Sequence, residues 1–244
     1  LKSNDVYITG DHLNALLHDD SPSAYIEKVL EPKTFSFVDL FAGIGGFRIA
    51  FQNQGGQCVF SSEKDSKAQE TYLWNYKEKP FGDISEIHSR YIPDHDVLLA
   101  GFPCQPFSNA GLKMGFQDTR GTLFYEIARI LEKKQPEFAI LENVKGIISN
   151  KSGQTLMSIL KFMNDIGYVC NISNEIIENK NIKEMKKQAK EMILKSCDFG
   201  VPQNRQRIFL VFWNQSKLTS FSKFEYPKPS GKITKVESVL EKKT

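Results

Sequence analysis

The sequence predicts an α/β domain built on a mostly parallel, twisted β-sheet that is flanked by helices. Short apolar runs that suit buried strands alternate with longer segments whose apolar residues recur at helical spacing. Strands that alternate with helices form βαβ units, and right-handed crossovers bring the carboxyl ends of parallel strands to one edge of the sheet. Ligands bind at that edge in such sheets.

The predicted elements follow one another from residue 35 to residue 213. Strands are expected at 35–41, 57–63, 96–101, 137–143 and 207–213. Helices are expected around 47–51, at 65–76 with Asp65 as the cap, at 122–134, and at 155–167. A lysine-rich segment at 175–196 interrupts this order, and we interpret it as a surface insertion that could form a solvated helix.

Composition narrows the class of protein. Hydrophobic residues make up 40% of the chain and charged residues 25%, which is ordinary for a soluble domain, and no apolar run reaches the ~20 residues of a membrane span. The four cysteines are widely spaced, so no metal site is expected, and they fit a reducing compartment. A net charge of +3 permits a nucleic-acid partner without arguing for one. The first residue is Leu1, which we interpret as a sign of processing or of a longer protein.

A glycine-rich turn follows the first predicted strand. The stretch DLFAGIGGF, residues 39–47, suits a close approach to a ligand, although it also suits a tight turn without one. Glu63, at the end of the second strand, could accept hydrogen bonds from ribose hydroxyls, and Asp83 could accept one from an adenine amino group. Together these features favour a nucleoside-binding edge, and the lack of G-x-x-x-x-G-K-[ST] excludes a P-loop.

A second group of side chains suggests nucleophilic chemistry at the same edge. Cys104 lies in GFPCQPFS, residues 101–108, where two prolines stiffen a non-helical loop. An isolated cysteine is more often inert, whereas a stiff polar loop suits a thiol presented for reaction. Glu142 ends an apolar strand, where it either faces a site or caps the next turn. Arg205 and Arg207 share one side of an extended segment and suit either surface decoration or a grip on a phosphate or carbonyl.

These motifs occur in an order that resembles the S-adenosylmethionine-dependent DNA (cytosine-5)-methyltransferases. The matching stretches, between residue 37 and about 213, are DLFAGIGGFRIAF, SSEKD, GDI, DVLLAGFPCQPFS, GFQDTRGTLFYEIARIL, LENVKGI and VPQNRQRIFLV. The set is far more specific than any single motif. The resemblance implies the Rossmann-like methyltransferase fold of that family, with S-adenosylmethionine as cofactor and S-adenosylhomocysteine as product.

The resemblance also implies a role for each catalytic residue. Cys104 would attack carbon 6 of a cytosine that is flipped out of the duplex, since stacked bases hide this atom. Glu142 would hydrogen-bond ring nitrogen 3 and the exocyclic amine, Arg207 would contact the base oxygen, and Arg205 would support the site. The attack makes carbon 5 nucleophilic enough to take the methyl group, and loss of the carbon 5 proton then expels the thiolate.

Cofactor and DNA contacts carry over in the same way. The residues expected to line the cofactor pocket are Phe41, Ala42, Gly43, Ile44, Gly45, Gly46, Glu63, Asp83, Ile84 and Pro103. The residues expected near double-stranded DNA are Gln105, Ser108 and Arg120, on a stretch that resembles the mobile loop of the family. The resemblance implies DNA methylation by base flipping in the restriction–modification system of a bacterial cytoplasm, with no membrane partner.

The chain departs from the family pattern at two places. Lys64 stands where the family often has a tryptophan that packs on the adenine, which predicts weaker cofactor binding. The late G-N-[SA]-V motif and a target-recognition domain are not found in the sequence. We therefore interpret 1–35 as an N-terminal extension with a short helix, 36–213 as the catalytic and cofactor-binding domain, and 214–244 as a linker toward a missing recognition domain. That domain would lie on a further C-terminal segment or on a second chain.

Three other functions compete with this interpretation. A transfer-RNA cytosine-5 methyltransferase shares the same motifs and fold, so the choice between DNA and RNA stays open on physical grounds. A non-catalytic subunit that binds the cofactor would have no need of Cys104, Glu142 and the two arginines. A nicotinamide oxidoreductase predicts a regular G-x-G-x-x-G, which this sequence lacks.

Overall fold

The computed structural model describes residues 35–103 and 123–240. The predicted extension before residue 35 lies outside this range. So does the stretch from 104 to 122 that carries Cys104, Gln105, Ser108 and Arg120, and the positions expected for these four residues stay predictions.

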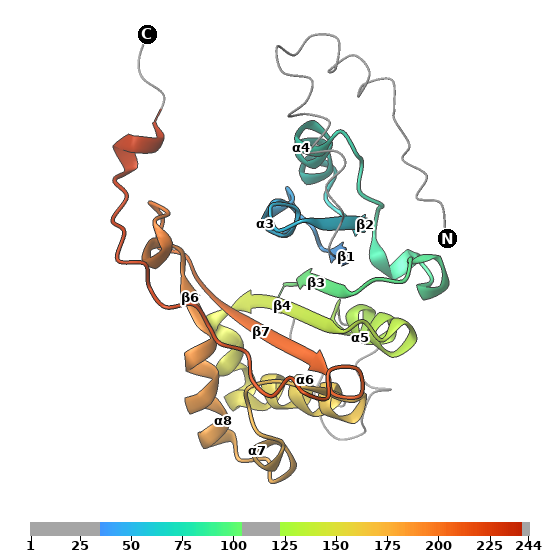
Figure 1. Cartoon of the computed structure of the whole chain (residues 1–244), viewed down its shortest axis with the longest axis vertical. Helices are drawn as coiled ribbons and strands as arrows, with labels where there is room; N and C mark the ends of the chain where they lie inside the picture. Colours follow the sequence, from blue (N-terminus) through green and yellow to red (C-terminus); the bar gives the residue numbers. More distant parts are fainter. Residues whose placement is uncertain (1–34, 104–122, 241–244) are drawn as a thin grey trace. The chain divides into compact units, whose positions relative to one another are not determined.

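A seven-stranded sheet forms the centre of the described domain (Figure 1). Its strands lie in the order β2-β1-β3-β4-β7-β5, with β6 also paired to β7. The four strands β2, β1, β3 and β4 are parallel, whereas β7 is antiparallel to each of its three neighbours, so β7 is the one reversed strand in the described sheet. The strands are β1 (Phe35–Leu40), β2 (Gly56–Ser62), β3 (Val97–Gly101), β4 (Phe138–Val144), β5 (Tyr168–Val169), β6 (Ile193–Lys195) and β7 (Gln206–Asn214).

Helices cover both faces of this sheet (Figure 1). On one face lie α3 and α4, and on the other lie α5 and α6, with α7 and α8 beside α6. The helices are α3 (Gly46–Gln52), α4 (Ser66–Tyr76), α5 (Leu123–Lys134), α6 (Gln154–Asp165), α7 (Asn174–Glu178) and α8 (Ile182–Ala189). This three-layer arrangement confirms the predicted α/β fold class, and the helix predicted from Asp65 begins as expected, with the Asp65 side chain accepting from the Ala68 backbone.

The two faces of the sheet are packed unequally. The larger apolar cluster joins the sheet to α5 and α6, and α5 alone contributes five buried side chains. The smaller cluster, under α3, is mainly aromatic: the rings of Phe37 and Phe51 lie 5.7 Å apart, with Phe35 and Phe47 beside them. The face under α3 and α4 also holds the buried polar residues Asp39 and Arg48.

The lysine-rich segment differs from a single solvated helix. It folds into two short helices, α7 and α8, followed by strand β6 on the edge of β7. Met185, Ala189 and Met192 are buried in the larger apolar cluster, whereas Lys183, Lys187 and Lys190 are exposed. These apolar residues recur at intervals of four and three along the segment, so one of its faces is part of the core.

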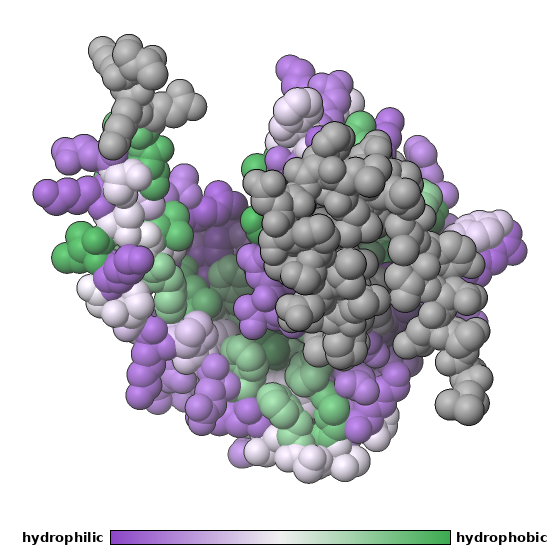
Figure 2. Space-filling view, turned by 45° about the horizontal axis from the view of Figure 1, so that its top comes forward, coloured by the Kyte–Doolittle hydropathy of each residue, from purple (hydrophilic) through white to green (hydrophobic). Residues whose placement is uncertain are grey.

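After β7 the chain runs back along the sheet without forming a long helix. Phe221 packs edge-on against Phe138 and Trp213, and the side chain of Asn171 exchanges two hydrogen bonds with the backbone of Phe224. The end of the described chain is exposed. Figure 2 shows hydrophobic residues among hydrophilic ones along this projecting segment, where Ile233 is 90% exposed. The domain boundary near residue 213 stays a prediction.

Among the described helices, none has both the length and the apolar character that crossing a membrane requires.

Candidate active site

The glycine-rich turn follows directly from β1. Phe41 adopts φ 57°, a left-handed conformation that is rare for residues with a side chain, and Gly43 and Gly45 adopt φ 57° and 93°. A Cβ at Gly45 would overlap with the ring of Tyr76, whose hydroxyl donates to the Gly45 carbonyl at 2.6 Å. A Cβ at Gly43 would meet no atom within 4 Å. Tyr76 of α4 therefore packs against the turn at Gly45, whereas the side of the turn at Gly43 is open.

Glu63, at the end of β2, is bonded to the glycine turn. One carboxylate oxygen accepts from the backbone N–H of Gly43 and the other accepts from that of Asp65, each at 2.8 Å. An ionised carboxylate has about four acceptor sites, so each oxygen can accept one more hydrogen bond. The predicted acid is thus fixed beside the turn and still able to bind a ligand.

Asp83 lies next to Lys64 in the structure. Its Oδ1 accepts from the backbone and hydroxyl of Ser85, and its Oδ2 lies 2.6 Å from Nζ of Lys64. The hydrogen bond from Lys64 is the main reason why the pKa of Asp83 lies below its usual value. The Lys64 side chain is 80% exposed and can leave the carboxylate without disturbing the core. The neighbouring Ile84 is buried.

Glu142 meets the two predicted arginines. Its Oε1 lies 2.9 Å from Nε of Arg207 and 3.8 Å from Nη2 of Arg205. The Glu142 and Arg207 side chains are 19% and 23% exposed, against 53% for Arg205, so the partly buried pair is the stronger one. The second oxygen, Oε2, has no hydrogen-bond partner among the described residues and lies beside Gly101. Within the described ranges, this second oxygen is therefore available to accept a hydrogen bond.

The reversed direction of β7 explains why Glu142 lies beside Arg207 and Arg205. Glu142 pairs with Phe209, and Val144 pairs with Arg207, so the beginning of β7 lies against the end of β4. A parallel β7 would have brought its end, not its beginning, to this edge. The arginines are thus placed by the start of a strand rather than by the carboxyl end that the parallel pattern suggested.

Register across the sheet brings the two groups to the same edge. Leu40 pairs with Ala100, and Ala100 pairs with Leu141, so the end of β1 lies level with the residue before Glu142, on the other side of β3. Two strand spacings separate β1 from β4 by roughly 10 Å. Phe47 of α3 lies beside Gly101 of β3, with its ring 6.4 Å from that of Phe209 on β7. The glycine turn and the Glu142–Arg207 pair therefore share one edge of the sheet.

Two buried polar residues that the sequence did not single out support this edge. Asn143 is 1% exposed, and its side chain donates to the Phe102 carbonyl at 2.8 Å while accepting from the Val144 backbone. It thereby fixes the chain just before the exposed Pro103 and the predicted nucleophile Cys104. The sequence did contain a signal for this role, because Asn143 is a polar residue at the end of an otherwise apolar strand.

Asp39 is the second such residue. It is fully buried before the glycine turn, and neither carboxylate oxygen has a hydrogen-bond partner among the described residues. Burial raises the pKa of Asp39 to about 7, although the nearby positive charge of Arg48 opposes this rise. The Arg48 guanidinium is itself bonded to Tyr72 at 2.9 Å and to Glu78 at 2.6 Å.

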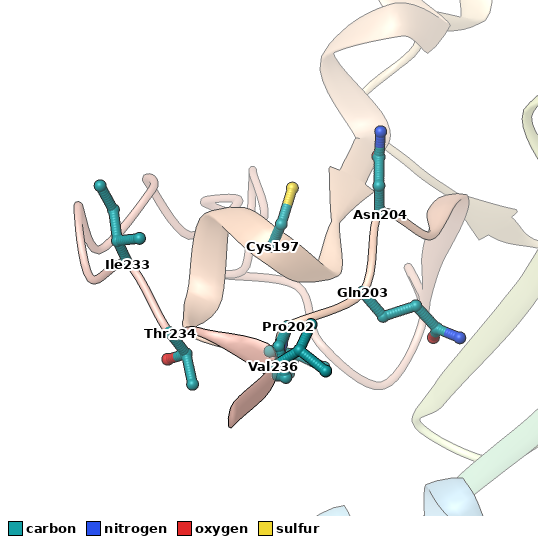
Figure 3. A pocket seen from close by; sticks show the side chains of 8 residues that line it. Cys197, Pro202, Gln203, Asn204, Ile233, Thr234 and Val236 are labelled. Carbon is teal, nitrogen blue, oxygen red and sulfur yellow. The ribbon is translucent and has the colours of Figure 1, made fainter. Parts of the chain in front are cut away.

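A shallow pocket of about 320 Å³ lies beside the loop that carries Arg205 (Figure 3). Its lining residues are Cys197, Val201, Pro202, Gln203, Asn204, Ile233, Thr234 and Val236. None of the predicted catalytic or cofactor residues within the described ranges lines this pocket, so it is separate from the candidate site.

Comparisons with known proteins show which family and which fold this chain resembles. A family model described as C-5 cytosine-specific DNA methylase matches residues 35–244. Type II methyltransferase M.HpaII of Haemophilus parainfluenzae is 46% identical over 213 residues, which cover 86% of this chain and 54% of that protein. Type II methyltransferase M.HhaI of Haemophilus parahaemolyticus is 41% identical over 204 residues, 84% of this chain and 56% of that protein. The chain thus spans about half the length of these curated relatives.

Among solved structures, a mutant of Spodoptera frugiperda DNMT2 superposes with a TM-score of 0.64 over 86% of this chain and 61% of that one. Its sequence identity is 21%, so this likeness concerns the fold alone, and it confirms the predicted Rossmann-like methyltransferase architecture.

Proposed function

The chain belongs to the family of C-5 cytosine-specific DNA methylases, and from that premise we propose that it transfers a methyl group from S-adenosylmethionine to carbon 5 of cytosine in double-stranded DNA. The observation that carries the proposal is the Glu142–Arg207 pair, which lies at the same sheet edge as the glycine turn. The curated relatives are bacterial Type II methyltransferases, which supports a role in a restriction–modification system of the bacterial cytoplasm.

The residues of the turn fit S-adenosylmethionine. Gly43 leaves open space where a side chain would stand, and Glu63 keeps acceptor sites for ribose hydroxyls beside it. Asp83 can accept from an adenine amino group once Lys64 moves aside. When bound, the cofactor supplies an electrophilic methyl group. The residues that would hold it are Phe41, Ala42, Gly43, Ile44, Gly45, Gly46, Glu63, Asp83, Ile84 and Pro103.

Each of the proposed catalytic residues would act on a different part of the cytosine. The Cys104 thiolate would bond to carbon 6, which makes carbon 5 nucleophilic, and it would leave after carbon 5 has lost its proton. Oε2 of Glu142 is available to accept from the exocyclic amine, and the protonated carboxyl group would donate to ring nitrogen 3. Arg207 would contact the base oxygen from the other side of the pair, with Arg205 in support. Asn143 holds the chain two residues before the thiol.

We further propose that target recognition needs protein beyond these 244 residues, either a C-terminal segment or a second chain, because the curated relatives are about twice as long. Specific recognition adds roughly 4–10 kcal/mol over non-specific DNA binding, and base contacts supply it. The net charge of +3 offers little phosphate attraction in its place. Gln105, Ser108 and Arg120 would contribute the part of the DNA contact that this chain provides.

Transfer of a labelled methyl group tests the proposal. The chain together with its recognition region is expected to label double-stranded DNA, and to be trapped covalently on DNA that contains 5-fluorocytosine, because fluorine cannot leave as a proton does. Cys104→Ala is expected to abolish trapping, and adducts that persist in this variant would contradict the assigned nucleophile. Labelling of RNA in place of DNA would favour the RNA methyltransferase instead.

A further inference from the structure

The segment between α4 and β3 carries Asp83 on two very short turns. These are the 3₁₀ turns η1 (Ile84–Glu86) and η2 (Ser89–Tyr91), and Asp83 caps the first of them. Turns of three residues contain few internal hydrogen bonds, so their geometry depends on partners elsewhere in the fold. The position of the Asp83 carboxylate therefore depends on what holds η1 and η2.

Arg129 of α5 holds both turns at once. Its Nη2 donates to the carbonyls of Ile84 and Ile87, each at 2.7 Å, and its Nη1 donates to the Ser89 hydroxyl at 2.9 Å. Its Nε donates to Oε2 of Glu126, one turn earlier on the same helix, at 2.6 Å. One guanidinium thus joins the end of η1 to the start of η2.

The surroundings make this attachment rigid. The Arg129 and Glu126 side chains are 18% and 12% exposed, and α5 is anchored in the core by buried residues on its opposite face, among them Ile127 and Ile130. A planar guanidinium offers donors in fixed directions, which a lysine ammonium on a flexible stem does not. The carbonyl of Ile84 belongs to the residue next to Asp83, so a change at Arg129 is transmitted to Asp83 through a single residue.

We propose that Arg129 is a positioning residue for adenine selection: it fixes the turns that aim the Asp83 carboxylate at the exocyclic amino group of the cofactor base. The inference rests on the proposed function, because that function assigns the adenine to Asp83. The hydrogen bonds of Arg129 go to η1, to the residues between η1 and η2, to η2 and to its own helix, so its effect on the choice of base is transmitted through these turns.

Calorimetry with two ligands tests the inference on the whole chain. S-adenosylhomocysteine carries the amino group, whereas S-inosylhomocysteine carries a carbonyl at the same position, which would meet the Asp83 carboxylate unfavourably. The wild-type chain is expected to prefer the adenosyl ligand by roughly tenfold or more, the cost of an unmade bond to a charged group. Arg129→Gln is expected to bring this ratio of dissociation constants to within about threefold of unity, mainly by weakening adenosyl binding.

A matched control lies on the same helix. Lys134 pairs with Asp94 at 2.8 Å, which also ties α5 to the segment before β3, but farther from Asp83. Lys134→Gln is expected to keep the wild-type ratio, since this pair touches neither η1 nor η2. Arg129→Lys, which retains a donor, is expected to give an intermediate ratio and serves in place of Arg129→Gln if that variant does not fold.

The outcomes separate the two proposals. A folded Arg129→Gln or Arg129→Lys variant that keeps the wild-type preference overturns the role of Arg129 and leaves the proposed function standing. A wild-type chain that binds neither ligand, or binds both equally, contradicts the assigned cofactor site and the inference with it. A fall in thermal stability without a change in the ratio marks Arg129 as structural only, and also overturns the inference.

Discussion

The two halves of the ligand-binding edge hold their carboxylates in different ways. On the cofactor side, Glu63 is bonded by two backbone N–H groups that cannot move away without unfolding the turn. On the catalytic side, Glu142 is held by the side chain of Arg207, with Arg205 farther away. Groups fixed by backbone are organised before a ligand arrives. Groups fixed by a long side chain can exchange partners when a ligand enters.

The difference suggests a division of labour between binding and chemistry. In the proposed function, the cofactor side would bind the same molecule in every reaction cycle, which favours a fixed geometry. The catalytic side would accept a base, take part in its reaction and release it, which favours contacts that can be remade. Substitutions on one side should therefore leave the other largely unaffected, and this independence is open to test.

The largest expected effect lies on the catalytic side. Glu142→Gln should lower the rate of methyl transfer by roughly 10²–10⁴-fold, because a neutral amide cannot exchange a proton with the ring as a carboxyl group does. Affinity for S-adenosylhomocysteine should stay within about twofold of wild type, since Glu142 lies two strands from the glycine turn. Rates in single-turnover assays and calorimetry measure the two quantities. Glu137→Gln, just before the start of β4, is the matched control. If Glu142→Gln lost cofactor affinity by as large a factor as it lost rate, the two sides of the edge would not be independent.

Asp39→Asn should change the pH dependence of stability. The pKa of Asp39 is raised from 3.8 to about 7, so the folded chain binds a proton that the unfolded chain has lost between these values, and wild-type stability falls as pH rises through this window. The variant should lack this fall and gain up to roughly 4 kcal/mol over wild type at pH 8, about three pKa units. Urea unfolding between pH 4 and 8 measures the free energy of unfolding of both proteins, and Asp165→Asn, at an exposed position, is the control. Identical slopes in Asp39→Asn and wild type would show that Asp39 is ionised in the folded chain.

Glu63→Ala should weaken cofactor binding without affecting catalysis by bound enzyme. Losing a hydrogen bond to a charged group costs roughly 1.5–3 kcal/mol, which corresponds to about one to two orders of magnitude in the dissociation constant. Calorimetry with S-adenosylhomocysteine measures this loss, and Glu70→Ala, an exposed residue on α4, is the control. Unchanged affinity in Glu63→Ala would place the ribose elsewhere.

The smallest expected effect is that of Lys64→Met. Lys64 lowers the pKa of Asp83, so the stability that this contact contributes is complete above the ordinary value of 3.8 and is lost as pH falls through the lowered value. Lys64→Met should therefore be slightly less stable than wild type at pH 6, and this difference should shrink as pH falls below the ordinary value, because wild type then loses the contact as well. The difference should be small because Lys64 is exposed. Thermal unfolding of both proteins at pH values from 3 to 6 measures this difference in stability. A difference in stability between Lys64→Met and wild type that is absent at pH 6 and appears only below pH 4 would contradict the assignment.

Local sequence predicted the elements well where a period or a cap was present. The runs at 96–101 and 137–143 form β3 and β4, and the helix predicted at 65–76 is α4. The direction of β7 was not predictable, because an apolar run carries no information about the neighbour with which it pairs. Strands β5 and β6, of two and three residues, are too short to show any period.

The candidate site was predicted residue by residue only where a motif marked it. Glu63, Asp83, Glu142 and Arg207 all lie at the expected edge, whereas their partners did not follow from the sequence. The contact of Lys64 with Asp83 joins positions that are distant in the chain, and the burial of Asp39 depends on helices that cover it. Such contacts arise from tertiary packing, which local patterns do not encode.

The direction of β7 also determines where the segment that follows it lies. Because β7 begins at the ligand edge, it ends with Asn214 at the far side of the domain, and the chain must return. It does so over residues 215–230, and the backbone N–H of Ser230 reaches the Asp198 carbonyl at 2.9 Å, back beside the loop of the two arginines. Because one strand is inverted, the chain crosses the domain twice, and Ser230 comes to lie on the same side as the start of β7, where the proposed DNA contact would form.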